Sequence, residues 1–555
     1  MLNSDDRPII VQSDGTILLD VHSANFQDAR DDISGFAELI KSPEHIHTYE
    51  ISSLSLWNAA SAGISPEQAI ASLDKWARFK IPENIIFKIK ESGSLFGKII
   101  LLPSEFPEKY ILKVTDDKIF LELLAIKKLQ KYLLPLYDQS GFYISALNRG
   151  IIKQELITQG YPVRDNIPLA SGDSMEISFR KTTSSGKPFS IRNYQEEAAQ
   201  AFYGNNLPGN GYGTIVLACG SGKTVVGMRI MELCQTKTLI LTTNIAAVHQ
   251  WINELLDKTT LTRDDIGEYS GDKKEIKPVT IATYQILTWR PGKEENFPHF
   301  ELFKKDNWGL VIYDEVHLLP APVFRITAEI QAISRVGLTA TLIREDGLEK
   351  NLFSLVGPKR FDCPWKILQE KGWIAQASCH EIRIELPEEL KIPYATATRR
   401  EKFRIASENP RKMEIIKEII ENRKDDFILI IGQYLSQLKE VKKLINVPLI
   451  TGQTPNKLRE EIYAKFREGK ERIIIVSKVA NFAIDLPDAS VAIQISGSFG
   501  SRQEEAQRLG RILRPKERNS YFYSLTSRFT VEEEFSANRQ KFLTEQGYEY
   551  QIETR

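Results

Sequence analysis

The sequence has few cysteines and no excess of charge of either sign. Its 555 residues contain four cysteines, Cys219, Cys234, Cys363 and Cys379, and no Cys-x-x-Cys pair. This usage argues against structural disulfides and against a cysteine zinc site. Lysine plus arginine and aspartate plus glutamate both number 73, so the formal net charge is zero. No global basic field therefore predicts nucleic-acid binding, although a local basic groove is compatible with this balance.

Long apolar runs are also missing. No stretch approaches the length of a membrane span, and the N-terminus lacks the apolar core of a signal peptide. His45 and His47 form a His-x-His pair in a segment otherwise poor in ligands, and we interpret them as ordinary polar residues. These absences predict a cytoplasmic protein with no membrane partner.

Composition and turn signals divide the chain into five predicted parts, all in an α/β protein. Strands alternate with helices in two successive sets, which predicts two tandem parallel-sheet domains preceded by smaller α+β accessory domains. The first part has a hairpin signal at Ser13–Thr16 and a helix start at Ser65-Pro66, and a winged-helix-like domain is one option for it. The predicted parts are residues 1–104, the β-rich segment and linker 105–185, the sheet domains 186–362 and 363–530, and a C-terminal tail 531–555.

A glycine-rich turn follows the apolar run Gly213–Leu217 and leads into a helix that begins near Val225. Backbone N–H groups at such a helix start bind phosphates, and glycines let the chain approach them closely. Lys223 would reach the β- and γ-phosphates and Thr224 would bind Mg²⁺. Leu217 stands where the usual pattern has glycine, so a glycine turn with a surface lysine is the alternative. The candidate nucleotide-binding residues are Cys219, Gly220, Ser221, Gly222, Lys223 and Thr224.

An acidic pair closes a later buried strand, Leu310–Tyr313. Asp314 at the tip of this strand can hold Mg²⁺ through water, and Glu315 can polarise a water that attacks the γ-phosphate. Buried acidic pairs are costly unless they are paired or bind a metal ion. Together with the glycine-rich turn, this pair predicts a nucleotide hydrolase.

The second strand–helix set has no phosphate loop, but it contains Gln507-Arg-Leu-Gly-Arg-Ile-Leu-Arg514. On a helix Gln507, Arg511 and Arg514 share one face, which suggests a common anionic target. An arginine that reaches a γ-phosphate from another domain accelerates hydrolysis strongly. The alternative is an amphipathic helix with solvated surface arginines.

These motifs, in this order over about residues 186–530, resemble a superfamily 2 helicase motor, in which two RecA-like domains hold ATP between them. Within that superfamily the motif sequences are most similar to those of the XPB group of DNA helicases. Cys219-Gly220 in the phosphate loop matches that group as well. The matching stretches are Arg192–Gln195 (adenine side), His249–Trp251 (motif Ia), Asp314–His317 (II), Thr339–Asp346 (III and the Arg-Glu-Asp motif), Ser477–Pro487 (V) and Gln494–Arg514 (through VI).

The resemblance implies ATP- and Mg²⁺-dependent 3′→5′ unwinding of DNA, or translocation along it, in DNA repair or strand opening. Single- and double-stranded DNA are the implied partners, with a stimulating protein such as a nuclease. Arg192 and Gln195 would contact the nucleotide, and residues 105–185 would lie where the family has a DNA-recognition domain. The implied coupling residues are Thr339, Thr341, Arg344, Glu345, Asp346 and Asp485.

Four polar residues at strand ends are candidate contacts to the DNA backbone: Thr243, Thr283, Thr451 and Ser477. Each is equally well placed to cap a helix. A basic stretch, Tyr394–Met413, is the candidate for the thumb-like insertion of the family. Two other functions stay open at this point: an RNA helicase, and an ATP-dependent switch or scaffold that performs no unwinding.

Overall fold

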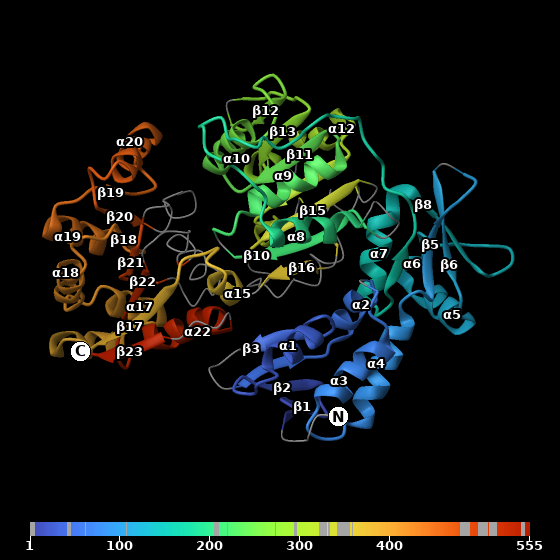
Figure 1. The fold of residues 1–555 in the computed structure, drawn as a ribbon, viewed down its shortest axis with the longest axis horizontal. Coiled ribbons are helices and arrows are strands. Elements are labelled where there is room, and N and C mark those ends of the chain that lie inside the picture. The colour runs from blue at the N-terminus through green and yellow to red at the C-terminus, as the bar shows by residue number, and fades with distance from the viewer. Residues whose placement is uncertain are drawn as a thin grey trace. The chain divides into compact units, whose positions relative to one another are not determined.

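The chain forms two compact units in the computed structural model (Figure 1). The first holds residues 1–40, 45–216 and 222–362, and the second holds residues 41–44, 217–221 and 363–555. The structure describes residues 6–41, 46–61, 63–106, 108–204, 210–218, 220–271, 273–292, 297–320, 323, 330, 333–340, 356–357, 359–363, 365–477, 489–497, 509, 519–545 and 550–555.

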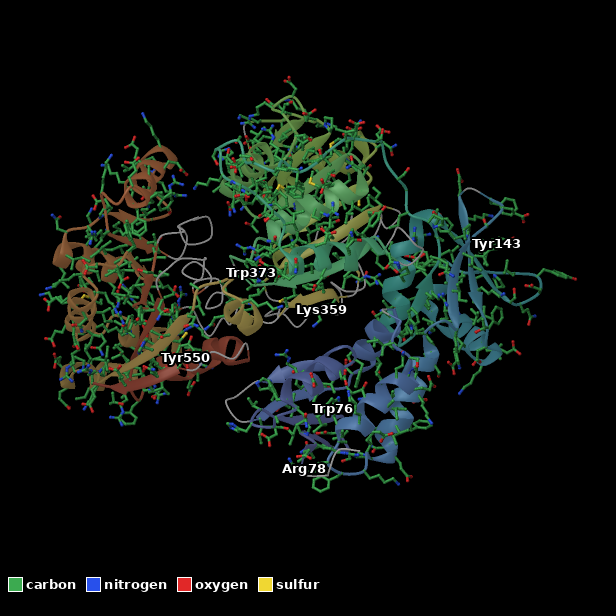
Figure 2. The ribbon with its side chains drawn as sticks, in the orientation of Figure 1. Trp76, Arg78, Tyr143, Lys359, Trp373 and Tyr550 are labelled. Atoms are coloured by element: carbon green, nitrogen blue, oxygen red, sulfur yellow. The ribbon has the colours of Figure 1, made fainter. Side chains whose placement is uncertain are left out.

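The N-terminal part of the first unit packs four helices with a four-stranded sheet of order β1-β2-β4-β3. Its hairpin and the helix start at Ser65 lie where the sequence predicts them, and Ser65 accepts a hydrogen bond from the Gln68 backbone N–H. Trp76, labelled in Figure 2, is buried and donates its indole N–H to Asp32 Oδ2 at 2.6 Å. The elements are β1 (Ile9–Val11), β2 (Thr16–Asp20), α1 (Phe26–Ser34), β3 (Glu38–Lys41), β4 (Ile46–Glu50), α2 (Ser53–Ser61), α3 (Pro66–Trp76) and α4 (Glu83–Leu95).

A five-stranded sheet of order β7-β8-β6-β5-β9 follows. The predicted boundary between residues 104 and 105 falls between two paired strands of this sheet, β5 and β6. The elements are β5 (Ile99–Pro103), β6 (Lys109–Val114), α5 (Asp117–Ala125), α6 (Lys127–Gln130), β7 (Leu134–Pro135), β8 (Gly141–Ser145), α7 (Arg149–Thr158) and β9 (Val163–Asp165).

Residues 166–189, here called the strap, run along the first large sheet domain. Isolated β-bridges join Ala170 to Ile333, Ser174 to Thr236 and Phe179 to Thr259. The strap includes Lys181–Lys187, the predicted linker, and within it Ser184 Oγ donates a hydrogen bond to Asp257 Oδ1 at 2.7 Å. This segment is therefore docked on the domain that follows it.

The first large sheet has seven strands in the order β12-β13-β11-β14-β15-β10-β16. Parallel pairing runs from β12 through to β10. Strands β11 and β13 are buried along their whole length because helices follow them, and their apolar runs reflect this. The strands are β10 (Tyr212–Leu217), β11 (Thr238–Thr242), β12 (Ile266–Tyr269), β13 (Val279–Thr283), β14 (Leu310–Asp314), β15 (Ser334–Thr339) and β16 (Lys359–Cys363).

Three of the described helices of this domain each follow a strand, and one precedes β10. The described helices are α8 (Asn193–Tyr203), α9 (Lys223–Cys234), α10 (Ile245–Lys258), α11 (Tyr284–Leu287) and α12 (Leu302–Lys305), with short 3₁₀ turns η4 (Pro298–Glu301) and η5 (Val316–Leu318).

A buried cationic cluster joins the five-stranded sheet to the amino-terminal ends of β10 and β15. Asp165 binds Arg149 Nη2 at 2.9 Å and Lys153 Nζ at 2.7 Å. Tyr212 pairs with Arg335 in the sheet, and the Arg335 guanidinium lies 5.0 Å from the Tyr212 ring centre. Lys153 Nζ and the Arg360 guanidinium lie 5.1 and 5.2 Å from the same centre. We use "cationic cluster" for Arg149, Lys153, Asp165, Tyr212, Arg335 and Arg360.

The second unit is built on another seven-stranded sheet, of order β19-β20-β18-β21-β22-β17-β23. Its strands pair in parallel. Residues 531–555, the predicted tail, supply α22 and the edge strand β23, at whose start Figure 2 labels Tyr550. The strands are β17 (Ala377–Ile384), β18 (Ile428–Gly432), β19 (Leu449–Ile450), β20 (Ile473–Ser477), β21 (Val491–Gln494), β22 (Ser520–Ser527) and β23 (Tyr550–Thr554).

The helices of this unit include the predicted basic insertion, Tyr394–Met413, which covers the end of α16, all of α17 and the start of α18. A buried ion pair of 2.9 Å joins Lys412 to Glu532 of α22. The described helices are α15 (Trp365–Glu370), α16 (Glu388–Thr396), α17 (Arg399–Ser407), α18 (Lys412–Asn422), α19 (Leu435–Ile445), α20 (Asn456–Arg467) and α22 (Val531–Glu545). The predicted fold class, two tandem RecA-like parallel-sheet domains preceded by α+β domains, is confirmed. No helix in the described part of the chain has the length and apolar character needed to cross a bilayer.

Candidate active site

The phosphate loop lies between β10 and α9. Gly220 and Gly222 have φ of +77° and +86°, a left-handed backbone that a side chain would strain. Ser221 is buried, and its hydroxyl donates to the Ala218 carbonyl at 2.7 Å, which ties the loop to itself. Helix α9 begins at Lys223, so its first N–H groups point into the loop. The turn therefore has the backbone of a phosphate cradle.

The predicted nucleotide-binding lysine, Lys223, and the predicted catalytic glutamate, Glu315, lie close together. Lys223 Nζ lies 3.5 Å from Glu315 Oε1, and both side chains are mostly buried. Glu315 follows β14 with φ of +49°, a left-handed conformation that is costly for a residue with a side chain. Its other oxygen, Oε2, is buried and lies 3.5 Å from His317 Nδ1. This oxygen is suited to accept a proton from a bound water.

Asp314 lies at the tip of β14 with its carboxylate held by two donors. Oδ2 accepts the Trp251 indole N–H at 2.9 Å, and Oδ1 accepts the Glu315 backbone N–H at 3.1 Å. Burial, and then the neighbouring Glu315, raise the pKa of Asp314 to about 6. Burial also acts on Glu315, but Lys223 and His317 outweigh it and lower the pKa of that carboxyl.

These residues fit Mg²⁺. A buried carboxylate whose pKa is raised is poorly compensated by the protein, and a divalent cation would stabilise its charged form. Thr224, the second residue of α9, supplies a hydroxyl of the kind that Mg²⁺ prefers beside a carboxylate. The charges of the acidic pair and the lysine are thus suited to bind one cation and an anionic phosphate.

His317 joins the ends of two neighbouring strands. Its Nδ1 lies 2.6 Å from the hydroxyl of Thr339, the last residue of β15, and 3.5 Å from Glu315 Oε2. Both His317 and Thr339 are buried. The His317 imidazole therefore connects the end of β15 to Glu315.

The predicted adenine-side residues lie at the start of α8. Gln195 Oε1 accepts the Arg192 backbone N–H at 3.0 Å, and Arg192 Nη1 donates to the Tyr194 hydroxyl at 3.3 Å. A Cβ atom added to Gly222 would lie 2.5 Å from Gln195 Nε2. Gln195 thus packs directly on the phosphate loop, and glycine at 222 makes this approach possible.

The four candidate DNA contacts differ in their surroundings. Thr283 is buried and its hydroxyl accepts the Ile286 N–H at 3.3 Å, so the N-cap alternative is the arrangement found there. Ser477 is also buried. Thr451 Oγ1 accepts the Gln453 N–H at 3.2 Å, and Thr243 Oγ1 accepts the Asn244 side-chain amide at 3.0 Å. Thr243 and Thr451 are half-buried.

Nine of the predicted site residues lie outside the described residues, and their roles stay predictions: Cys219, Thr341, Arg344, Glu345, Asp346, Asp485, Gln507, Arg511 and Arg514.

The sequence predicts no contact to Asp314 for two residues that bind it, although one of them, Trp251, lies in the motif Ia stretch. Trp251 holds the Asp314 carboxylate, and the Tyr284 hydroxyl donates to the Asp314 backbone carbonyl at 3.0 Å. Both are buried aromatics with a polar group, a class of side chain that usually finds a partner inside a protein. That chemistry signals a hydrogen bond, but the sequence does not indicate with which residue.

The phosphate loop, the acidic pair and Thr339 lie at the carboxyl ends of β10, β14 and β15, which are consecutive in the sheet order. This arrangement defines a phosphate-loop nucleotide hydrolase, and the second parallel sheet places it among the two-sheet helicase motors.

Comparisons with known proteins identify the family. A DNA 3′-5′ helicase XPB of Mycobacterium tuberculosis is 45% identical over 550 residues, covering 99% of this chain and 98% of that protein. The same-named protein of Kineococcus radiotolerans is 44% identical over 549 residues, 99% of this chain and 96% of that protein. The XPB/SSL2 helicase/translocase subunit of general transcription and DNA repair factor IIH of Saccharomyces cerevisiae is 30% identical, covering 99% of this chain and 72% of that protein.

Three family descriptions match parts of the chain. They are the ERCC3/RAD25/XPB C-terminal helicase (residues 368–555), the helicase conserved C-terminal domain (9–138) and the type III restriction enzyme res subunit (188–344). A fragment described as an HsdR subunit of a Vibrio vulnificus type I restriction enzyme has a similar fold, with a TM-score of 0.50 and 17% identity over 66% of this chain and 69% of that one. The chain belongs to the XPB family of DNA helicases.

Proposed function

We propose that this protein is an ATP-dependent DNA helicase or translocase with 3′→5′ polarity. Family membership over nearly the whole chain supports this function. The observation that carries it is the juxtaposition of Lys223, Asp314 and Glu315 at one sheet edge. A scaffold that only binds ATP does not need a glutamate that can accept a proton from the attacking water. We therefore favour hydrolysis over a passive switch.

The described residues suggest a sequence of events at the site. The Lys223–Glu315 ion pair must open when ATP binds, because Lys223 then turns to the phosphates. Glu315 is thereby freed to accept a proton from the attacking water. Asp314 and Thr224 would hold Mg²⁺, which neutralises phosphate charge and orients the γ-phosphate. Gln195 and Arg192 lie on the loop side, where we propose that they contact the base.

The remaining assignments are also proposals. We assign Gln507, Arg511 and Arg514 to charge stabilisation in hydrolysis, as the family resemblance implies. Thr341, Arg344, Glu345, Asp346 and Asp485 would couple hydrolysis to movement on DNA, together with Thr339. Thr243 and Thr451 are better candidates than the buried Thr283 and Ser477 for contacts to DNA phosphates.

Further proposals concern the setting in which the motor works. We propose that the two motor domains begin near residues 186 and 363, as predicted, and that residues 531–555 belong to the second of them. We also propose a role in DNA repair or strand opening, a stimulating protein partner such as a nuclease, and a cytoplasmic location. These rest on the family resemblance and on cysteine usage.

An ATPase assay with single-stranded DNA, duplex DNA and RNA as activators tests the function. We expect stimulation by DNA that weakens steeply with salt, because backbone phosphates dominate such binding. Duplexes with a 3′ or a 5′ single-stranded tail test the polarity, and only the 3′-tailed substrate should open. Stimulation by RNA alone would favour the RNA-helicase alternative, and nucleotide binding without turnover would favour the switch.

A further inference from the structure

The hydrogen bond from Trp251 to Asp314 joins helix α10 to the metal-binding carboxylate. Trp251 is 1% exposed, and its indole has a single donor, which points at Asp314 Oδ2. The bond spans 63 residues of sequence, so it depends on tertiary packing and not on local structure. Its partner is the oxygen that the Glu315 backbone N–H does not occupy.

The ring of Trp251 is fixed from the opposite side by the phosphate-loop helix. A Cβ atom added to Gly227 of α9 would lie 2.6 Å from Trp251 Cη2 and 3.2 Å from a methyl group of Leu338. Only glycine lets the indole pass this close to α9. The ring therefore lies between the helix that starts at Lys223 and the strand that ends at Asp314.

Residues of α10 show why the indole is held rather than mobile. Val248, Trp251, Ile252 and Leu255 form the buried stripe of this helix. Asn244 caps its start by accepting the Ala247 N–H at 3.0 Å. Within this stripe Trp251 alone carries a polar group, so the packing of the whole stripe determines where the N–H points.

We propose that Trp251 is a positioning residue that sets the rotation of the Asp314 carboxylate for Mg²⁺. The inference rests on the proposed Mg²⁺-dependent hydrolysis and adds a specific residue to it. Trp251 and the Glu315 backbone N–H each bind one oxygen of Asp314, so together they fix the rotation of the carboxylate and the direction of its remaining lone pairs. Loss of such outer-shell hydrogen bonds typically costs about 10–100-fold in metal affinity.

The test measures binding and does not require turnover. A fluorescent non-hydrolysable ATP analogue is bound to the full-length protein while Mg²⁺ is titrated, and anisotropy gives the Mg²⁺ midpoint. Trp251→Phe keeps most of the ring but removes the N–H, and should raise this midpoint about 10-fold or more. The affinity for the analogue in EDTA should change less than about threefold, because the substitution affects the binding of Mg²⁺ and not that of the nucleotide.

A matched control is available in the same unit. Trp308 is also 1% exposed, and its indole N–H donates to the Leu302 carbonyl at 2.9 Å, within a different cluster. Trp308→Phe removes the same donor and similar packing, and should lower the melting temperature while leaving the Mg²⁺ midpoint within about twofold of wild type.

Gly227→Ala supplies a second perturbation in case Trp251→Phe does not fold. The added methyl group favours the helix by about 1 kcal/mol but displaces the indole, so the Mg²⁺ midpoint should rise although the N–H is kept. Equal midpoints for Trp251→Phe and Trp308→Phe would overturn the inference alone. Nucleotide binding by the wild-type protein that ignores Mg²⁺ would overturn the proposed function as well.

Discussion

The first seven-stranded sheet carries charged side chains at both ends of its strands. We call the carboxyl ends of the strands the carboxyl edge and their amino ends the amino edge, and the two differ in how the charges are balanced. At the carboxyl edge, Asp314 and Glu315 have one lysine, Lys223, beside them among the described residues. At the amino edge, Asp165 faces four cationic groups of the cationic cluster. Each edge therefore holds a surplus of one sign in a place where water is scarce.

The surplus is compensated from different sources. In the cationic cluster the Tyr212 ring lies beneath three cations, and the Tyr212 carbonyl accepts from Arg360 Nε at 3.0 Å. The groups that compensate this cluster, Asp165 and the Tyr212 ring, belong to the chain itself, although burial still lowers the pKa of Lys153. At the carboxyl edge the Asp314 pKa stays raised, and Glu315 has Lys223 near one oxygen and His317 near the other. A substitution should therefore change function at the carboxyl edge and stability at the amino edge.

Lys223→Ala should have the largest effect. Without the ammonium group the phosphates lose their main side-chain charge, and ATP turnover should fall by at least about 1,000-fold, a typical cost of removing a charge that stabilises this transition state. The melting temperature should change little, because the ion pair of Lys223 with Glu315 is loose, at 3.5 Å. A phosphate-release assay and a thermal melt separate the two outcomes, and retained turnover would contradict the phosphate-loop assignment.

Asp165→Asn should have the next largest effect, on stability. It leaves Arg149 and Lys153 buried without their carboxylate, which typically costs about 3–5 kcal/mol. Urea denaturation measures this loss, and turnover well below the transition should stay within about twofold of wild type. The control is Asp173→Asn, which removes a 47% exposed partner of Lys237 and should cost no more than about 1 kcal/mol. Similar losses of unfolding free energy in both variants would mean that the buried Asp165 stabilises the protein no more than an exposed ion pair does.

Lys153→Met should have the smallest effect, visible in the pH dependence of stability. Burial lowers the pKa of Lys153 from 10.5 to about 8, with Arg149 and Arg335 adding to it and Asp165 opposing it. The folded state thus loses this proton before the unfolded state, so stability from this group rises with pH between about 8 and 10.5.

Urea denaturation at pH 7.5 and 9.5 tests this sign. The wild-type protein should gain about 1–2 kcal/mol relative to Lys153→Met across this interval. An equal change in both proteins would show that Lys153 keeps its proton in the folded state.

The sequence predicts the carboxyl edge far better than the amino edge. Lys223 and Asp314 each stand at the end of a local strand pattern, and parallel strands bring their ends together. Asp165 and Arg335 belong to different domains, and neither stands in a motif, so only the folded chain reveals their proximity. Trp251 and Asp314 do lie in matched motif stretches of one domain, but the motifs do not indicate that these two side chains bind each other. Strands β17, β22 and β23 give a weak signal in the sequence, because polar residues interrupt them and their apolar pattern is weaker than that of the central strands.

The strap has a mechanical consequence for such a motor. Bridges at Ala170, Ser174 and Phe179 fasten it to the first large sheet domain at three separate points, and the cationic cluster clamps the five-stranded sheet at its far end. A movement of the first large sheet domain during the ATP cycle would therefore carry the strap and the five-stranded sheet with it.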